Sequence, residues 1–132
     1  MLVISREQLD AFIAADDNEL EYHIAVALNK VDPLRTLGYR PELLRDKMIK
    51  NGVERARSHG LTKPEDVAAF VAVMFEVAPN FDEQPEINAI LKDTNFPPPE
   101  RFYQLFERAS DDAWLEAEKY YDYEAWFRTG TE

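Results

Sequence analysis

The chain contains no cysteine among its 132 residues. This absence excludes disulfide scaffolds, cysteine-based zinc sites, iron–sulfur clusters and thiol nucleophiles. Histidine is also scarce, because His23 and His59 are the two side chains that could titrate near neutral pH without perturbation. The four glycines are isolated from one another, so the chain has no glycine-rich loop to cradle a phosphate. We therefore expect a protein that is not an enzyme and that uses no cofactor or metal.

The chain also lacks a long apolar run. Its longest nearly apolar stretch, residues 67–78, spans 12 positions and is interrupted by Glu76, whereas a helix needs about 20 residues to cross a bilayer. Four apolar residues precede Ser5 and Arg6, which is too few for the core of a secretory signal of roughly 7–15 residues. We therefore expect a cytoplasmic protein without a membrane partner.

Helical periodicity runs through most of the chain. No stretch reaches four clean alternations of a strand pattern, whereas apolar residues recur three and four positions apart, as at Leu9, Phe12 and Ile13. Hydrophobic residues make up 45% of the chain and charged residues 31%, a composition typical of globular proteins. The length is also typical of one domain. The sequence predicts a single compact all-α domain over residues 1–132, built of five to six helices.

The most apolar helix is expected at residues 67–77, which are apolar on nearly every side. That pattern is typical of a central helix surrounded by others. Thr62 and Glu65 have the spacing of a capping box that would begin this helix. His59 and Gly60 predict the end of the preceding helix, where His59 would interact with the helix dipole and Gly60 would adopt a positive φ.

Proline is concentrated in one part of the chain. Residues 79–99 contain five of the eight prolines. Because glycine totals four in the whole chain and a flexible linker would be richer in it, this stretch predicts an ordered connection. Within it, residues 86–92 are expected to form two helical turns, with Phe81 and Phe96 as aromatic anchors.

Aromatic residues are concentrated near the C-terminal end, where six of the fourteen residues from 114 to 127 are aromatic. One helical stripe cannot bury all of them, and Trp and Tyr are enriched at the energetic centres of protein interfaces. Core packing and partner binding are both open for these rings. The candidate partner-binding aromatics are Trp114, Tyr120, Tyr121, Tyr123 and Trp126. Whether residues 100–127 form one helix or two is also open, because Ser110 could cap a new helix or lie within a continuous one.

The net charge of −11 is unevenly distributed. Residues 35–63 carry eight basic and three acidic side chains, a net +5, whereas the rest carries seven basic and 23 acidic side chains, a net −16. The acid excess argues against a nucleic-acid partner, since that affinity comes largely from neutralising phosphates. The basic segment could pair with acidic neighbours in the fold or form a docking face for an acidic partner, with Arg45, Lys47 and Lys50 as candidate contacts.

Several short motifs occur in a characteristic order. They are Ile4-Ser-x-x-Gln-Leu-x-x-Phe12, Gly52-Val-Glu-Arg-Ala56, His59-Gly-Leu61, Glu65-Asp-Val-x-x-Phe70 followed by Met74-Phe75, and Asn80-Phe-Asp82. In this order they resemble a group of small helical accessory proteins encoded in bacterial type VI secretion gene clusters. The resemblance covers about residues 3–92. The sequence departs from the family pattern at Asn80, where an acid is common.

The resemblance implies a non-catalytic accessory or co-chaperone role, in which the protein helps to load a toxin effector onto the secretion spike. The implied partner is a secretion effector or its adaptor chaperone. The motifs consist of packing and turn residues, so no catalytic residue is carried over from the family. The alternative is an acidic immunity protein that neutralises a toxin effector, since strong acidity would steer and hold a cationic active site. Both roles leave homo-oligomerisation open.

Overall fold

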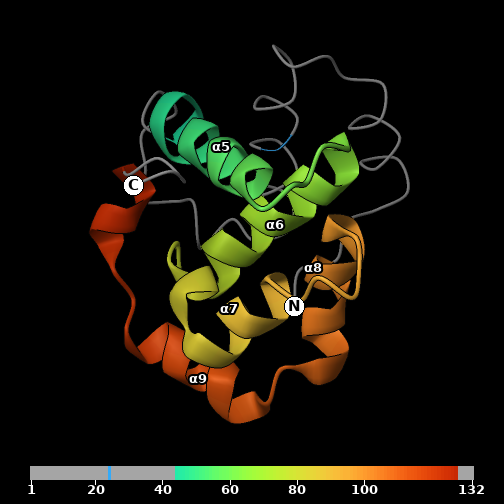
Figure 1. The fold of residues 1–132 in the computed structure, drawn as a ribbon. Coiled ribbons are helices and arrows are strands. Elements are labelled where there is room, and N and C mark those ends of the chain that lie inside the picture. The colour runs from blue at the N-terminus through green and yellow to red at the C-terminus, as the bar shows by residue number, and fades with distance from the viewer. Residues whose placement is uncertain (1–23, 25–43, 128–132) are drawn as a thin grey trace.

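The computed structural model describes Ile24 and residues 44–127 (Figure 1). The N-terminal helical stripe that begins at Leu9 therefore lies outside the described residues, as does His23. Ile24 is the exception in that stretch, because it is helical and its side chain is buried in the core.

The described residues form five α-helices and no strand. The helices are α5 (Lys50–Ser58), α6 (Pro64–Glu76), α7 (Pro85–Leu91), α8 (Pro98–Arg108) and α9 (Asp111–Lys119). Three shorter elements accompany them, namely the π-helical turn η1 (Leu44–Ile49) and the 3-10 turns η2 (Phe81–Glu83) and η3 (Tyr123–Phe127). The prediction of an all-α fold with five to six helices is confirmed. None of the helices in the described part of the chain combines the length and apolar character that a membrane crossing requires.

Helix α6 is the centre of the fold, and nine of its 13 residues are buried. Figure 1 shows α5 on one side of this helix and α7, α8 and α9 on the other. Gly52 allows α5 to approach α6 closely, because a Cβ atom at this position would lie 3.2 Å from Val71 Cγ2 and 3.3 Å from the Met74 sulfur. The apolar run at residues 67–77 is thus buried by helices on both sides, as the sequence pattern predicts.

The predicted capping box at the start of α6 is wrong. The N-cap residue is Lys63, and its side chain makes no capping hydrogen bond. Thr62 lies one position too early to cap the helix. Lys63 has extended backbone and Pro64 occupies the first helical position, where its fixed φ begins a helix and its missing N–H costs nothing.

Helix α5 ends in a Schellman motif. The N–H of Gly60 donates to the Arg57 carbonyl at 2.9 Å, and the N–H of Leu61 donates to the Ala56 carbonyl at 3.3 Å. Gly60 has a φ of 84°, which residues with a Cβ atom rarely adopt. A Cβ there would also lie 2.8 Å from Pro98. The predicted helix end at this glycine is confirmed, and it brings the start of α8 against the end of α5.

The proline-rich connection is ordered, as predicted. Phe81 is buried and Phe96 is half-buried. The helix expected over residues 86–92 is α7, which begins one residue earlier. Its N-cap is Gln84, whose side-chain oxygen accepts a hydrogen bond from the Ile87 N–H at 2.9 Å.

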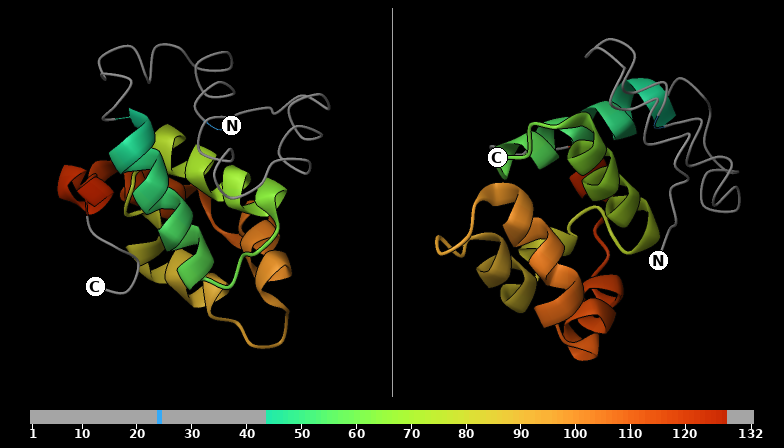
Figure 2. Two further views of the ribbon diagram at one scale, coloured as in Figure 1. Left: turned by 90° about the horizontal axis from the view of Figure 1, so that it is seen from above. Right: turned by 90° about the vertical axis from the view of Figure 1, so that its right-hand side faces the viewer.

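The C-terminal stretch forms two helices and a turn, which settles the question of one helix or two. The Ser110 side chain accepts a hydrogen bond from the Ala113 N–H and so begins α9. Helix α9 ends at Lys119, and the chain then returns to the far side of the fold as η3 (Figure 2). There η3 contacts η1 and α5, and the side-chain amide of Asn51 donates to the Trp126 carbonyl at 2.8 Å.

Candidate functional site

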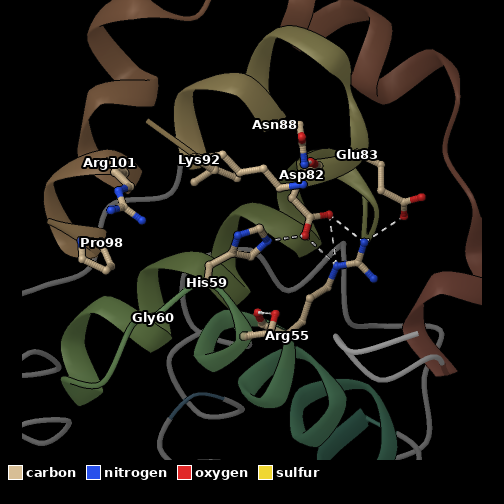
Figure 3. Close-up of a pocket in the computed structure, with 11 residues that line it drawn as sticks. Arg55, His59, Gly60, Asp82, Glu83, Asn88, Lys92, Pro98 and Arg101 are labelled. Atoms are coloured by element: carbon tan, nitrogen blue, oxygen red, sulfur yellow. Dashed lines mark hydrogen bonds and ion pairs between the residues drawn. The ribbon is translucent and has the colours of Figure 1, made fainter. Parts of the chain in front are cut away.

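A polar cavity of about 620 Å³ lies where the ends of α5 and α7 meet the start of α8 (Figure 3). Eleven residues line it: Arg55, Ser58, His59, Gly60, Asp82, Glu83, Asn88, Leu91, Lys92, Pro98 and Arg101. Its volume falls in the range of about 300–1,000 Å³ that is usual for small-molecule sites.

A buried ion pair forms one wall of the cavity. Arg55 is 7% exposed and Asp82 is 5% exposed. The Arg55 Nε donates to both carboxylate oxygens of Asp82, at 3.0 and 2.9 Å, and its Nη2 donates to Oδ1 at 2.7 Å. The same Nη2 also reaches the exposed carboxylate of Glu83 at 2.8 Å. Helix α5 is therefore joined to η2 by charge-assisted hydrogen bonds in a water-poor environment.

His59 completes this ion pair from the end of α5. Its Nε2 lies 2.7 Å from Asp82 Oδ2, and its ring centroid lies 5.4 Å from that of Phe70 on α6. Burial alone would raise the pKa of the Asp82 carboxyl, but hydrogen bonds from His59 and Arg55 outweigh it and hold that pKa below its ordinary value of 3.8. Because the carboxylate is ionised, His59 Nε2 is the donor in this bond.

The Asp82 carboxylate has its hydrogen-bond acceptor positions filled. The Asp82 oxygens accept the three bonds from Arg55 and the one from His59, which fills the roughly four acceptor positions of a carboxylate. The Asn88 side-chain amide donates to the Asp82 carbonyl at 3.0 Å and holds the main chain of η2. In the described part of the chain, no group of three acidic, His or Cys side chains is arranged to hold a metal ion.

This network predicts an acid-sensitive contribution to stability. The folded-state pKa of Asp82 lies below its ordinary value, so its contribution is fully present above the unfolded pKa of about 3.9 and is lost as the pH falls through the lower folded value. We expect the free energy of unfolding to fall less steeply below about pH 4 in Asp82→Asn than in the unaltered protein. Urea unfolding at a series of pH values measures this. Equal slopes in the two proteins would contradict the assignment.

A second depression, an apolar groove of about 270 Å³, lies between α6 and the α8–α9 pair. It is lined by Val73, Glu76, Val77, Phe106, Trp114, Leu115 and Glu118. The rings of Phe106 and Trp114 are stacked, with centroids 6.0 Å apart and planes 11° apart. Leu115 is 62% exposed and Phe106 is 38% exposed, so two large apolar side chains at this groove face water.

The aromatic candidates divide between the surface and the core. Trp114 is half-buried in the apolar groove, and Tyr120, Tyr121 and Tyr123 are exposed by 63%, 43% and 43%. Trp126 is 1% exposed, so for this ring the structure shows core packing, one of the two alternatives left open by the sequence. The reason is that η3 turns back onto the core, where the Trp126 indole packs against Phe75 with ring centroids 4.4 Å apart.

The basic candidates lie on the other side of the fold from the apolar groove. Lys47 on η1 and Lys50 at the start of α5 are exposed, and the side chain of Arg45 lies outside what the structure describes. Since η3 contacts η1, Tyr123 lies on an element next to that of Lys47. The structure does not bring Lys47 or Lys50 together with Trp114.

The polar cavity was not predicted from the sequence. Asp82 was assigned to no site, His59 to a helix end, and Arg55 to a basic segment. A usable signal was present, because these three residues belong to three of the motifs that carry the type VI resemblance. The structure brings those motifs together around one carboxylate. Comparison of the chain with protein-family models, with curated proteins and with solved structures finds no match.

Proposed function

We propose that this protein is a non-catalytic protein-binding accessory whose apolar groove receives an apolar segment flanked by basic side chains. The observation that carries the proposal is the groove itself, where Phe106, Trp114 and Leu115 are grouped on the surface beside α6. Grouped exposed apolar side chains on a protein surface are typical of interaction sites, and a half-buried Trp beside them is typical of an interface anchor.

The charge around the groove supports a basic partner segment. Helix α9 carries four acidic side chains and a single basic one: Asp111, Asp112, Glu116 and Glu118 against Lys119. The four acidic residues are all exposed, and Glu118 lines the groove directly. A segment with apolar contacts and basic flanks would match both the lining and the rim, and the acidic field would speed its association.

The resemblance to type VI accessory proteins supports a choice of partner. We propose that the segment belongs to a secretion effector or its adaptor chaperone and that binding assists loading onto the spike. Co-purification with the products of neighbouring genes tests this choice. Capture of the adaptor, or of the adaptor with the effector, supports it. Capture of a toxin domain alone, combined with death of the producing cell when the gene is deleted, would instead establish the immunity role.

A single substitution tests the groove. Leu115→Lys removes exposed apolar surface and places a positive charge against the basic flanks of the partner. Since full burial of a Leu side chain contributes about 1.5–3 kcal/mol, we expect affinity for the captured partner to fall at least about tenfold. Isothermal titration calorimetry measures it, and the melting temperature should stay within a few degrees because Leu115 is 62% exposed.

Ala89→Lys is the matched control for this substitution. Ala89 is exposed on α7, outside the groove lining, and the variant adds the same charge. It should bind like the unaltered protein. If Leu115→Lys also kept full affinity, the groove would not be the binding site.

A further inference from the structure

We propose that the polar cavity binds an oxyanion, a carboxylate or phosphate group, through Arg101 and Lys92. The cavity holds more positive than negative charge. Its two carboxylates, Asp82 and Glu83, both bond to the single guanidinium of Arg55. With Lys92 and Arg101, the lining carries three positive charges against two negative ones. Within the described part of the chain, neither of these two side chains lies within ion-pair distance of a carboxylate.

Arg101 is held in position for such a ligand. It is half-buried in the first turns of α8, and its Nε donates to the Phe96 carbonyl at 2.6 Å. This bond fixes the guanidinium plane and uses one of its five N–H groups, so the two Nη atoms keep four donors. A planar pair of Nη donors matches the two oxygens of a carboxylate or a phosphate.

The opposite wall of the cavity is held in a fixed geometry. His59 donates its Nε2–H to the Asp82 carboxylate, so this N–H is not available to an anion. Figure 3 shows the His59 ring and the Arg101 side chain on either side of the cavity. The ring is held by Asp82 and by contact with Phe70. The ion pair of Arg55 and Asp82 thus serves as the rigid base of the site and keeps its own carboxylate from competing for the cations.

The cavity differs in charge from the chain as a whole. The chain has a net charge of −11, which opposes anion binding overall, whereas the lining of the cavity carries a local excess of positive charge. The start of α8 adds little, because Pro98 and Pro99 lack N–H groups and the Arg101 N–H already donates to the Pro97 carbonyl. Recognition therefore depends on side chains, which substitutions can remove one at a time.

The test is a titration of the full chain with inorganic phosphate and, separately, with citrate, at low ionic strength with chloride as the reference anion. The readouts are the NMR signals of the Gly60 amide and of the Arg101 Nε–H. We expect saturable shifts confined to the cavity residues. Saturable shifts with phosphate alone support a phosphorylated ligand, and saturable shifts with citrate alone support a carboxylate ligand. Saturable shifts with both anions support a general oxyanion site. No saturation with either anion would overturn the proposal.

Variants separate a site from general electrostatics. Arg101→Gln and Lys92→Gln should each weaken binding at least about tenfold, the factor that corresponds to about 1.4 kcal/mol. Lys119→Gln removes the same charge from the end of α9, outside the cavity, and should leave affinity unchanged. Lys92 is exposed, so its variant keeps the test valid if Arg101→Gln unfolds. Equal weakening in Lys92→Gln and Lys119→Gln would refute the site.

Discussion

Asp82→Asn is expected to lower the free energy of unfolding by about 3–5 kcal/mol, which is the usual cost of removing one partner of a buried ion pair. The substitution keeps the shape of the side chain and removes its charge. It leaves the Arg55 guanidinium, 7% exposed, without its main counter-ion, and it points an amide at donors on Arg55 and His59. Urea unfolding followed by circular dichroism measures the loss.

Glu83→Gln is the matched control, because Glu83 bonds to the same Nη2 of Arg55 at 2.8 Å. The Glu83 side chain is 52% exposed, against 6% for the Asp82 side chain. Ion pairs at exposed positions contribute about 0–1 kcal/mol, so this variant should lose no more than about 1 kcal/mol. Similar losses in the two variants would mean that burial does not govern the strength of this network.

Trp126→Ala is expected to cost about 3–5 kcal/mol of unfolding free energy, the range for deleting a large buried aromatic side chain. The Trp126 ring packs on Phe75, and its indole N–H donates to the Tyr121 hydroxyl at 2.8 Å. Truncation would leave a cavity between η3 and α6. It would also loosen the return of η3 towards α5, which the Asn51 bond to the Trp126 carbonyl supports.

Tyr123→Ala provides the comparison from the same turn. Tyr123 is 43% exposed, and its ring contacts Phe127, which is itself exposed. Surface substitutions usually change stability by about 0.5 kcal/mol or less, so the melting temperature should hardly change. If Tyr123→Ala destabilised the protein as much as Trp126→Ala, the division of these aromatics into core and surface would be wrong.

The two sites differ in how well the sequence could predict them. The apolar groove was partly predictable. Trp114 belongs to a segment with more aromatic residues than one buried helical face can hold, so it was a candidate surface residue. The groove residues Val73 and Val77 were not predicted as surface residues, since they belong to the apolar stretch expected to form the central helix. They line a surface depression because of the way this stretch packs against α8 and α9. The polar cavity was not predicted at all, because Asp82 lies 27 residues from Arg55 and 23 from His59.

Local structure could be predicted from the sequence. Periodicity at three and four residues indicates helices because side chains at that spacing share one face. The end of α5 before Gly60 was predicted from that residue's ability to adopt a positive φ. The start of α9 at Ser110 was one of two alternatives, and the hydrogen bond from the Ala113 N–H to the Ser110 side chain decides between them. The error at Thr62 is of the same local kind, since Pro64 occupies the first helical position and moves the N-cap to Lys63.

Contacts between side chains that are distant in the sequence depend on the tertiary fold. Trp126 and Tyr123 lie three residues apart in one aromatic turn, yet one is 1% exposed and the other 43%, because η3 places one of its faces against Phe75. Asp82 belongs to an acidic pair in a proline-rich connection, and it becomes the centre of a network because the folding of η2 beside α5 brings Arg55 and His59 to it. Burial then makes these contacts strong, since charges away from water interact in a low dielectric. The sequence has no cysteine and two histidines. The fold gives one of these histidines, His59, a hydrogen bond to Asp82 and a place in the wall of the polar cavity.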